Sequence, residues 1–356
     1  MSSSPIASIL YGAFVSLFVV LTPLQPALAC TRAVYLGPDA TIITVRSMDW
    51  VNDIHTNLWA FPRGLERDGA AGPRSIGWTS KYGSVVAAGF DAASADGMNE
   101  KGLVANLLYL TESQYVTPTK DDARKPLSIA AWVQFVLDNF ATVAEAVDAL
   151  RNEVFYVVPM MTPDGKPGTM HLSISDATGD SAIFEYVGGK LNIHHGRQYQ
   201  VMTNSPIYDE QLALNAYWEQ IGGTTMLPGT NRAADRFVRA SFYIKAIPQT
   251  AEIRDALASA FGVIRNVSVP LGITTPGQPN ISSTLWRTVS DHKNKRYYFE
   301  STRSPNVFWV DFADIDFTAG QPTKKLTLTD GAILAGNTAA KFQPAEPFDF
   351  LPATAP

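Results

Sequence analysis

Short apolar runs, separated by turns that contain glycine and proline, dominate the chain between positions 30 and 110. Runs of this kind that are rich in β-branched and aromatic residues are typical of buried β-strands. The pattern predicts a hairpin in which residues 32–36 pair with residues 41–47 across the turn Gly37-Pro38-Asp39-Ala40. Further strands are predicted at 57–61, 84–89 and 103–108.

The spacing of apolar residues changes to a helical period after position 128. One face of the predicted helix carries Ile129, Trp132, Val133, Val136 and Leu137, and the pattern stops near residues 139–140. Thr142 is followed three residues later by Glu145, which is the spacing of a capping box whose glutamate reaches back to the cap. It predicts a second helix through Leu150. We expect both helices to lie on one face of a sheet.

Strand patterns return in the middle of the chain and alternate with helical ones to its end. A meander is predicted from short apolar runs at 155–158, 170–175, 182–187, 190–193 and 198–203. Helices are predicted at 233–247 and 251–261, and strands at 297–300 and 307–310. The proline-bearing tail from Phe342 is expected to be irregular. This order of elements indicates a layered α+β fold.

The first 29 residues have the organisation of a secretory signal peptide. An apolar run at 9–21 is broken by Pro23 and Pro26 and followed by Ala27-Leu28-Ala29, which has the small-residue pattern of a cleavage site. The apolar run is too short to span a bilayer comfortably. No lysine or arginine precedes Arg32, which departs from the usual signal. We expect residues 1–29 to be removed and the mature protein to be periplasmic or secreted.

Composition supports a single globular domain at 30–356. Hydrophobic residues make up 46% of the chain and charged residues 17%, which is enough apolar material for a sizeable core. The net charge of −5, with no basic cluster, argues against a nucleic-acid partner. No later run is long enough to cross a bilayer, so no stable membrane association is expected.

Cys30 is the only cysteine, and removal of the leader would make it the first residue. An α-amino group titrates near 7.7–8.0 and a free thiol near 8.5, so a terminal cysteine carries its own base beside its nucleophile. A lipoprotein, in which the thiol is acylated and tethered, is the main alternative. Bacterial lipoproteins usually carry leucine three residues before the cysteine, where this chain has Ala27. An inert thiol is the third possibility.

Four short motifs follow Cys30 in a characteristic order. They are Arg46-Ser47-Met48-Asp49, Asp96-Gly97-Met98-Asn99-Glu100-Lys101-Gly102-Leu103, Thr203-Asn204-Ser205-Pro206 and Asp235-Arg236-Phe237. Together they resemble the choloylglycine hydrolase family, which holds penicillin V acylases and bile salt hydrolases. The resemblance implies an N-terminal nucleophile hydrolase, which is a four-layer αββα sandwich that cleaves a linear amide bond and needs no metal or cofactor.

The resemblance also implies roles for five residues. Cys30 would attack the amide carbonyl and form an acyl-enzyme, while the cation of Arg46 favours the thiolate. Asp49 would accept a hydrogen bond from the Cys30 amino group. Asn204 would bind the developing oxyanion, and Arg236 would organise the surroundings of the nucleophile. Structural alternatives remain open: a surface strand residue for Arg46, turn residues for Asp49 and Asn204, and a solvated helix residue for Arg236.

Three residues are candidates for substrate binding. Tyr109 falls where bile salt hydrolases carry an asparagine and penicillin V acylases a tyrosine; its backbone N–H could serve the oxyanion and its ring an aryl group. Met48 and Trp50 flank Asp49 and would line the acyl pocket, although core packing is equally compatible with them. We therefore expect a penicillin V acylase acting on phenoxyacetyl or similar acyl amides. N-acyl homoserine lactones and conjugated bile acids are the alternative substrates.

Other chemistries find no support in the sequence. It contains no Gly-x-Ser-x-Gly elbow, no HExxH motif and no glycine-rich phosphate loop. His194 and His195 are adjacent in a predicted strand and would point to opposite faces, so a shared metal is not expected. Asn99 and Glu100 are interpreted as structural. A homo-oligomer is expected, although the segment between Asn204 and Arg236 is shorter than the one with which Gram-positive members build a tetramer.

Overall fold

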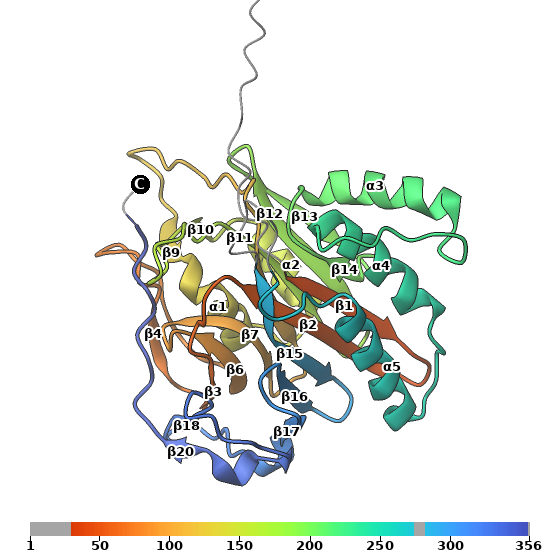
Figure 1. The fold of residues 1–356 in the computed structure, drawn as a ribbon. Helices are drawn as coiled ribbons and strands as arrows, with labels where there is room; N and C mark the ends of the chain where they lie inside the picture. The colour runs from red at the N-terminus through yellow and green to blue at the C-terminus, as the bar shows by residue number, and fades with distance from the viewer. Residues whose placement is uncertain (1–29, 274–281, 355–356) are drawn as a thin grey trace, which may run out of the picture.

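The computed structural model describes residues 30–273 and 282–354 (Figure 1). The predicted signal peptide, 1–29, lies outside the described residues, so its removal stays a prediction. In the described part of the chain, no helix is both long and apolar enough to cross a membrane.

A seven-stranded sheet carries the N-terminal hairpin. Its strand order is β14-β1-β2-β15-β16-β17-β19. These strands are β1 (Thr31–Leu36), β2 (Ile42–Trp50), β14 (Val201–Met202), β15 (Ser283–Asp291), β16 (Arg296–Ser301), β17 (Phe308–Asp311) and β19 (Gly336–Asn337). The predicted hairpin is confirmed, since β1 pairs antiparallel with β2. Both long central strands, β2 and β15, have nine residues, and β2 is buried along its whole length.

A nine-stranded sheet faces the first, in the order β13-β12-β11-β8-β7-β6-β3-β18-β20. Its strands are β3 (Asn57–Phe61), β6 (Ser84–Gly89), β7 (Ala93–Asn99), β8 (Val104–Tyr109), β11 (Met170–Ser175), β12 (Ser181–Val187), β13 (Lys190–His195), β18 (Lys324–Leu326) and β20 (Gln343–Pro344). Two small sheets pair β4 (Glu66–Asp68) with β5 (Gly77–Thr79) and β9 (Lys125–Ser128) with β10 (Phe155–Val158).

The predicted meander is confirmed for its three middle strands and wrong for its first and last strands. Strands β11, β12 and β13 follow one another as neighbours, but β10 leaves the group and pairs in parallel with β9. The run at 198–203 shortens to the two residues of β14, which join β1 in the other sheet. A chain that changes sheets here brings the segment after β14, including Asn204, next to the N-terminal strand.

Helices cover the two sheets on different faces (Figure 1). The 3₁₀ turn η1 (Ile129–Ala131), α1 (Trp132–Asn139) and α2 (Val143–Arg151) contact the nine-stranded sheet, whereas α4 (Ala233–Ala246) and α5 (Ile253–Asn266) contact the seven-stranded one. Helix α3 (Tyr208–Ile221), which the sequence pattern missed, packs mainly on α4. Two further 3₁₀ turns, η2 (Phe312–Asp314) and η3 (Ala339–Lys341), lie near the C-terminus.

The capping box predicted at Thr142 is present with one difference. The Thr142 side chain accepts a hydrogen bond from the Glu145 backbone nitrogen, as expected for an N-cap. The Glu145 carboxylate, however, accepts from the nitrogen of Ala141 and not from that of Thr142. Both bonds still satisfy donors near the start of α2, so the helix begins where the sequence predicts.

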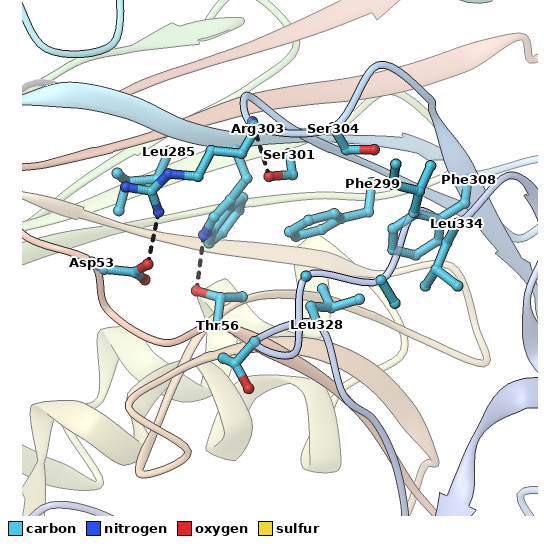
Figure 2. A pocket seen from close by; sticks show the side chains of 15 residues that line it. Asp53, Thr56, Leu285, Phe299, Ser301, Arg303, Ser304, Phe308, Leu328 and Leu334 are labelled. Atoms are coloured by element: carbon cyan, nitrogen blue, oxygen red, sulfur yellow. Dashed lines mark hydrogen bonds and ion pairs between the residues drawn. The ribbon is translucent and has the colours of Figure 1, made fainter.

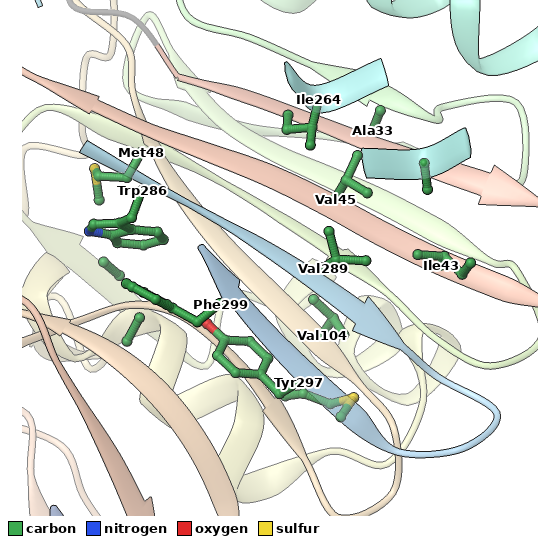
Figure 3. Packing of buried hydrophobic residues seen from close by; sticks show 14 of the residues in the cluster. Ala33, Ile43, Val45, Met48, Val104, Ile264, Trp286, Val289, Tyr297 and Phe299 are labelled. Carbon is green, nitrogen blue, oxygen red and sulfur yellow. The ribbon is translucent and has the colours of Figure 1, made fainter. Parts of the chain in front are cut away.

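Two hydrophobic clusters make up the core. The first fills the space between the sheets and under α4 and α5, and includes Met48, Trp286, Phe299 and Val289 (Figure 3). The second lies between the nine-stranded sheet and α1 and α2. The C-terminal tail, predicted to be irregular, wraps this second cluster with Phe348 and Phe350. Cys30 belongs to the first cluster, so the predicted nucleophile lies at the edge of the inter-sheet core.

Gly97 gives a test of how tightly the nine-stranded sheet packs. A Cβ there would lie 2.7 Å from Val86 Cγ1 and 2.8 Å from the carbonyl oxygen of Val85. Gly97→Ala is therefore expected to lower the free energy of unfolding by about 1–3 kcal/mol. Gly262, an exposed residue of α5 where an added Cβ would have no neighbour within 4 Å, is the control. Gly262→Ala should raise stability by about 0.5–1 kcal/mol, since alanine favours helix. Urea denaturation measures both, and an unchanged Gly97→Ala protein would contradict the packing.

Candidate active site

Cys30 lies immediately before β1 and is 2% exposed. Its sulfur is 3.5 Å from the backbone nitrogen of Asp49 and 3.6 Å from the Asp49 carbonyl oxygen, so it rests against the end of β2. The sulfur is also 4.0 Å from Met48 Sδ and 3.9 Å from Arg46 Nη2. The hairpin thus places the first predicted motif directly beside the thiol.

Alternation along β2 sorts the residues of that motif between two faces. Successive side chains of a strand point to opposite sides, so Arg46, Met48 and Trp50 share one face. All three line the same cavity as Cys30. Asp49 points the other way, toward Arg236 of α4, with 3.9 Å between its Oδ2 and Nη1 of the arginine. One strand therefore supplies the wall of the pocket on one face and a charged partner of Arg236 on the other.

Arg46 is fully buried and crosses from one sheet to the other. Its Nη2 donates to the carbonyl oxygen of Leu107 in β8 at 3.1 Å and reaches Met48 Sδ at 3.4 Å. Its guanidinium lies over the ring of Trp286, 4.5 Å from the centroid. Such burial excludes the alternative of a surface strand residue. A cation held beside a thiol favours the thiolate, which is the role that the sequence resemblance implies.

Arg236 and Asn204 meet at the backbone of Cys30. Arg236 Nη1 donates to the Cys30 carbonyl oxygen at 2.6 Å and to Thr31 Oγ1 at 2.5 Å, and its Nη2 donates to Asn204 Oδ1 at 2.8 Å. Asn204 Nδ2 donates to the carbonyl oxygen of Tyr109 at 2.7 Å. Arg236 is therefore not a solvated helix residue.

The hydrogen bond expected from the Cys30 nitrogen to Asp49 is not the one observed. The nitrogen donates to Asn204 Oδ1 instead. Asp49 Oδ1 accepts from Thr284 Oγ1 at 2.5 Å, and its Oδ2 lies 3.5 Å from Ser47 Oγ. In the full-length chain the Cys30 nitrogen belongs to a peptide bond and has one hydrogen, which Asn204 takes. A bond to Asp49 needs the further hydrogens of a free amine.

Burial and charge act against each other on the ionisable groups. Burial raises the pKa of the Cys30 thiol above its ordinary value, whereas the cations of Arg46 and Arg236 act to lower it. Burial also raises the pKa of Asp49 to about 6, although Arg236 and the hydrogen bond from Thr284 oppose this. The thiol of the uncleaved chain is therefore mainly protonated near neutral pH.

The cavity in front of the sulfur is predominantly apolar, with a volume of about 520 Å³ including its open mouth. Trp50 and Tyr109 meet edge to face there, with 5.8 Å between ring centroids. The indole nitrogen of Trp50 donates to Asp164 Oδ2 at 2.9 Å, which fixes the ring. The three predicted substrate-binding residues thus line one cavity with Cys30. The cavity is also lined by Ile54, Phe90, Met160 and Met170, which no sequence pattern indicated.

A larger cavity, of about 850 Å³ including its open mouth, is lined by Trp286 among other residues, and Cys30 is not one of them (Figure 2). It is bordered by Phe299, Phe308 and the loop that ends at Leu334, and an ion pair of 2.8 Å between Arg303 and Asp53 stands at its rim. The predicted nucleophile therefore lies at the smaller cavity.

The adjacent histidines of β13 have different partners. His194 Nε2 lies 2.8 Å from Asp209 and His195 Nε2 lies 2.7 Å from Asp180, so the adjacent pair does not converge on one point. Across residues 30–273 and 282–354, no group of three or more histidine, cysteine, aspartate or glutamate side chains could hold a metal ion.

Comparison with known sequences decides the family. The sequence model of the linear amide C–N hydrolases, choloylglycine hydrolase family, matches residues 30–325. The chain belongs to this family. It is an amidohydrolase that acts on linear amides. The matched region includes Cys30 and all the other predicted site residues.

Similar proteins include penicillin V acylases and bile acid hydrolases. The chain is 55% identical to the penicillin V acylase of Pectobacterium atrosepticum over 348 residues, covering 91% of this chain and 92% of the relative. It is 27% identical over 310 residues to the bile salt hydrolase/transferase of Clostridium perfringens, covering 79% and 92%. The solved penicillin V acylase of Agrobacterium tumefaciens superposes with a TM-score of 0.84 at 60% identity, covering 91% of this chain and 100% of that one. The conjugated bile acid hydrolase of C. perfringens follows, with a TM-score of 0.72 at 25% identity, covering 83% and 96%.

The raised pKa of Asp49 predicts a specific dependence of stability on pH. Its folded value of about 6 lies above its ordinary value of 3.8, so its contribution is fully present below pH 3.8 and is lost as the pH rises through 6. Relative to Asp49→Asn, the wild type should lose roughly 2–3 kcal/mol of unfolding free energy between pH 4 and 7. Urea denaturation of both proteins across this range gives the difference. If the wild type instead gains unfolding free energy relative to Asp49→Asn as the pH rises, the Arg236 charge has a larger effect on the pKa of Asp49 than burial has.

Proposed function

We propose that the protein is an exported penicillin V acylase of the N-terminal nucleophile type, in which Cys30 becomes the first residue and attacks the amide of a phenoxyacetyl or similar acyl group. The two sheets with helices on their outer faces would then form the four-layer αββα sandwich of such hydrolases. The observation that carries the proposal is the convergence of Cys30 with Arg46, Asn204 and Arg236 beside an aromatic cavity. The similarity to two penicillin V acylases supports it.

The geometry supports a two-step mechanism. The free amine of Cys30 takes the thiol proton, and the sulfur attacks the carbonyl carbon of the substrate. Asn204 Nδ2 and the backbone N–H of Tyr109 would stabilise the oxyanion, a contribution worth about 3 kcal/mol for one preorganised donor. The C–N bond breaks, and the protonated amine gives its proton to the leaving nitrogen. Water, deprotonated by the same amine, then cleaves the thioester and releases the carboxylic acid.

The wall of the cavity favours an aryl acyl group. Trp50, Tyr109 and Met48 give it two aromatic rings and a polarisable thioether. A phenoxy ring can pack against these groups edge to face. N-acyl homoserine lactones, with flexible apolar chains, are the second candidate substrates for the same cavity. Conjugated bile acids are the third, because their sterol body is much bulkier than a phenoxy group.

The alternative of an envelope-anchored lipoprotein fits the site poorly. The Cys30 sulfur is enclosed by Asp49, Met48 and Arg46, and the residue is 2% exposed. A diacylglycerol group on that sulfur would have to enter the inter-sheet core. Buried thiols of this kind favour a small-molecule substrate that approaches through the cavity.

The proposed enzyme is exported and forms a homo-oligomer. The predicted signal peptide would send the mature enzyme to the periplasm or the medium. Exposed apolar side chains on and after α3, namely Leu214, Tyr217 and Met226, are 43%, 60% and 55% exposed. Exposed apolar side chains favour contact with another protein surface, and a second copy of this chain is the simplest partner.

Maturation and the nucleophile are tested together. The exported wild type should have the intact mass of a chain that begins at Cys30 without an adduct, and iodoacetamide should add once and abolish hydrolysis. Cys30→Ser should lose most activity, because a hydroxyl ionises far less readily than a thiol. The same variant is the control for alkylation, since the chain has no other cysteine. A diacylglycerol adduct, or full hydrolysis by the alkylated protein, would refute the mechanism.

Substrate preference is tested by comparing kcat/KM for penicillin V, an N-acyl homoserine lactone and glycocholate. Penicillin V is expected to have the highest kcat/KM.

The contribution of the aromatic wall is tested with a variant of Trp50. Trp50→Leu should lower kcat/KM for penicillin V by about two- to tenfold, because the aromatic contact with the acyl group is lost. Trp309→Leu is the matched control, because Trp309 is a half-buried residue of β17 outside the cavity. It should leave kcat/KM for penicillin V unchanged. A clear preference for glycocholate would overturn the assignment of substrate but not that of the nucleophile.

A further inference from the structure

We propose that Trp286 is a positioning residue of this site: its ring holds the Arg46 guanidinium beside the Cys30 thiol without supplying a negative charge that would offset the cation. The inference deepens the proposed function, because it rests on Cys30 as the nucleophile. It assigns a role to a residue of β15 that belongs to none of the four sequence motifs and does not line the cavity in front of the sulfur.

Sheet register brings the ring of Trp286 and the guanidinium of Arg46 together. Trp286 lies directly opposite Met48 in the antiparallel pair of β15 with β2 (Figure 3). Opposite residues of such a pair have their side chains on the same face, and a residue two places along is a diagonal neighbour within reach of long and aromatic side chains. Arg46 is that neighbour, and its Cζ lies 4.5 Å from the centroid of the ring. Nη2 of the same guanidinium lies 3.9 Å from Cys30 Sγ, so one side chain joins Trp286 to the nucleophile.

Arg46 forms no ion pair with any carboxylate of the described residues. Its Nη2 has the Leu107 carbonyl oxygen at 3.1 Å and Met48 Sδ at 3.4 Å. Its Nε and Nη1 are buried, and neither has a hydrogen-bond partner within residues 30–273 and 282–354. A buried cation without partners is costly, whereas an aromatic face attracts a desolvated cation strongly. The ring of Trp286 thus supplies stabilisation that hydrogen bonds do not.

An aromatic partner affects the thiol differently from a carboxylate. A carboxylate bonded to Arg46 would offset its charge, and the attraction that favours the thiolate would weaken. The ring of Trp286 is neutral and attracts the cation through its quadrupole, so the full charge still acts on the sulfur. Burial raises the pKa of the Cys30 thiol, and Arg46 is the strongest of the groups that lower it. Trp286 therefore fixes the position of the cation and leaves its charge to the thiolate.

Trp286 is itself held by uncharged groups. The residue is 3% exposed, and its Nε1 donates to Thr56 Oγ1 at 2.9 Å. Its ring lies 5.3 Å from that of Phe299, measured between centroids. The indole is therefore fixed at its edge and against a second ring, as a platform for a cation has to be.

The charged groups that act on the thiol are Arg46 and Asp49 of β2 and Arg236 of α4. Arg46 also opposes the effect of burial, which raises the pKa of Asp96 of β7, but the two form no ion pair among the described residues. Of these four groups, Arg46 is the one whose charge lies over the ring of Trp286. Replacement of the ring is therefore expected to act on the thiol through Arg46.

The test is the rate of alkylation of mature enzyme by iodoacetamide as a function of pH, which reports the ionisation of the single thiol. Trp286→Leu removes the ring, so the guanidinium is held less firmly and its attraction to the thiolate weakens. The thiol pKa should rise by roughly 0.5–1, which makes alkylation below that pKa about three- to tenfold slower. The rate at alkaline pH should not fall, because a thiolate of higher pKa is the stronger nucleophile. Trp286→Phe keeps an aromatic face and should shift the pKa in the same direction by less.

Trp78→Leu is the matched control. Trp78 is also buried, its Nε1 donates to Asp138 Oδ2 at 2.8 Å, and its ring lies 5.2 Å from that of Phe135. It belongs to the other core cluster, and no lysine or arginine of the described residues lies over its ring. Trp78→Leu should therefore lose stability without moving the thiol pKa.

Arg46→Gln separates positioning from packing. In a chain without the cation, Trp286→Leu should leave the thiol pKa unchanged, because the two effects are coupled through Arg46. A rise of the same size in both backgrounds overturns the inference. So does a thiol pKa that is unchanged or lowered in Trp286→Leu, or in Trp286→Phe if the leucine variant does not fold. Hydrolysis by alkylated wild type would instead refute the nucleophile, so the two failures are distinguishable.

Discussion

The structure around the site depends on one buried guanidinium. Arg236 reaches from α4 to the carbonyl of Cys30, the hydroxyl of Thr31 and the amide of Asn204, and it faces Asp49. These partners come from positions far apart in the chain, and no exposed surface remains on the arginine to let water replace any of them. Since leaving a buried charge without partners costs several kcal/mol, the helix, both strands and the loop after β14 are constrained to meet there.

Strand β2 carries residues of the site on both of its faces. Its alternation separates the residues that line the cavity, Arg46, Met48 and Trp50, from Asp49, which faces Arg236. A shift of register by one residue would exchange the two sets and place Asp49 in the cavity. The pairing of β2 with both β1 and β15 over many residues prevents such a shift. The site is therefore specified by sheet register as much as by the residues themselves.

The sequence could predict what depends on local pattern and on ordered motifs. The N-terminal hairpin, strands β3 and β6 and helices α1, α2 and α4 follow from periodicity and capping. The candidate site residues came from the resemblance of the ordered motifs to the choloylglycine hydrolase family, and the structure brings Cys30, Arg46, Asp49, Tyr109, Asn204 and Arg236 together. Helix α3 was missed because its polar and apolar residues are mixed around most of its surface, and the short β14 because its register comes from tertiary contact with β1. Phe90, Met160 and Met170 reach the cavity from separate loops and strands, a convergence that no linear pattern encodes.

The hydrogen bond of the Cys30 nitrogen gives a physical reason why the proposed mechanism would require removal of residues 1–29. In the full-length chain this nitrogen is an amide, which is not basic, and its single hydrogen goes to Asn204. Burial meanwhile raises the pKa of the thiol, and the nearby cations only partly offset this. Cleavage after Ala29 would create an amine that titrates near 7.7–8.0, adjacent to the sulfur and with hydrogens free for Asp49. The base thus comes into existence only at the mature terminus. Since the fold already holds Arg46, Asn204 and Arg236 in place around an amide nitrogen, the proposed cleavage would need to change a single functional group and no element of the scaffold.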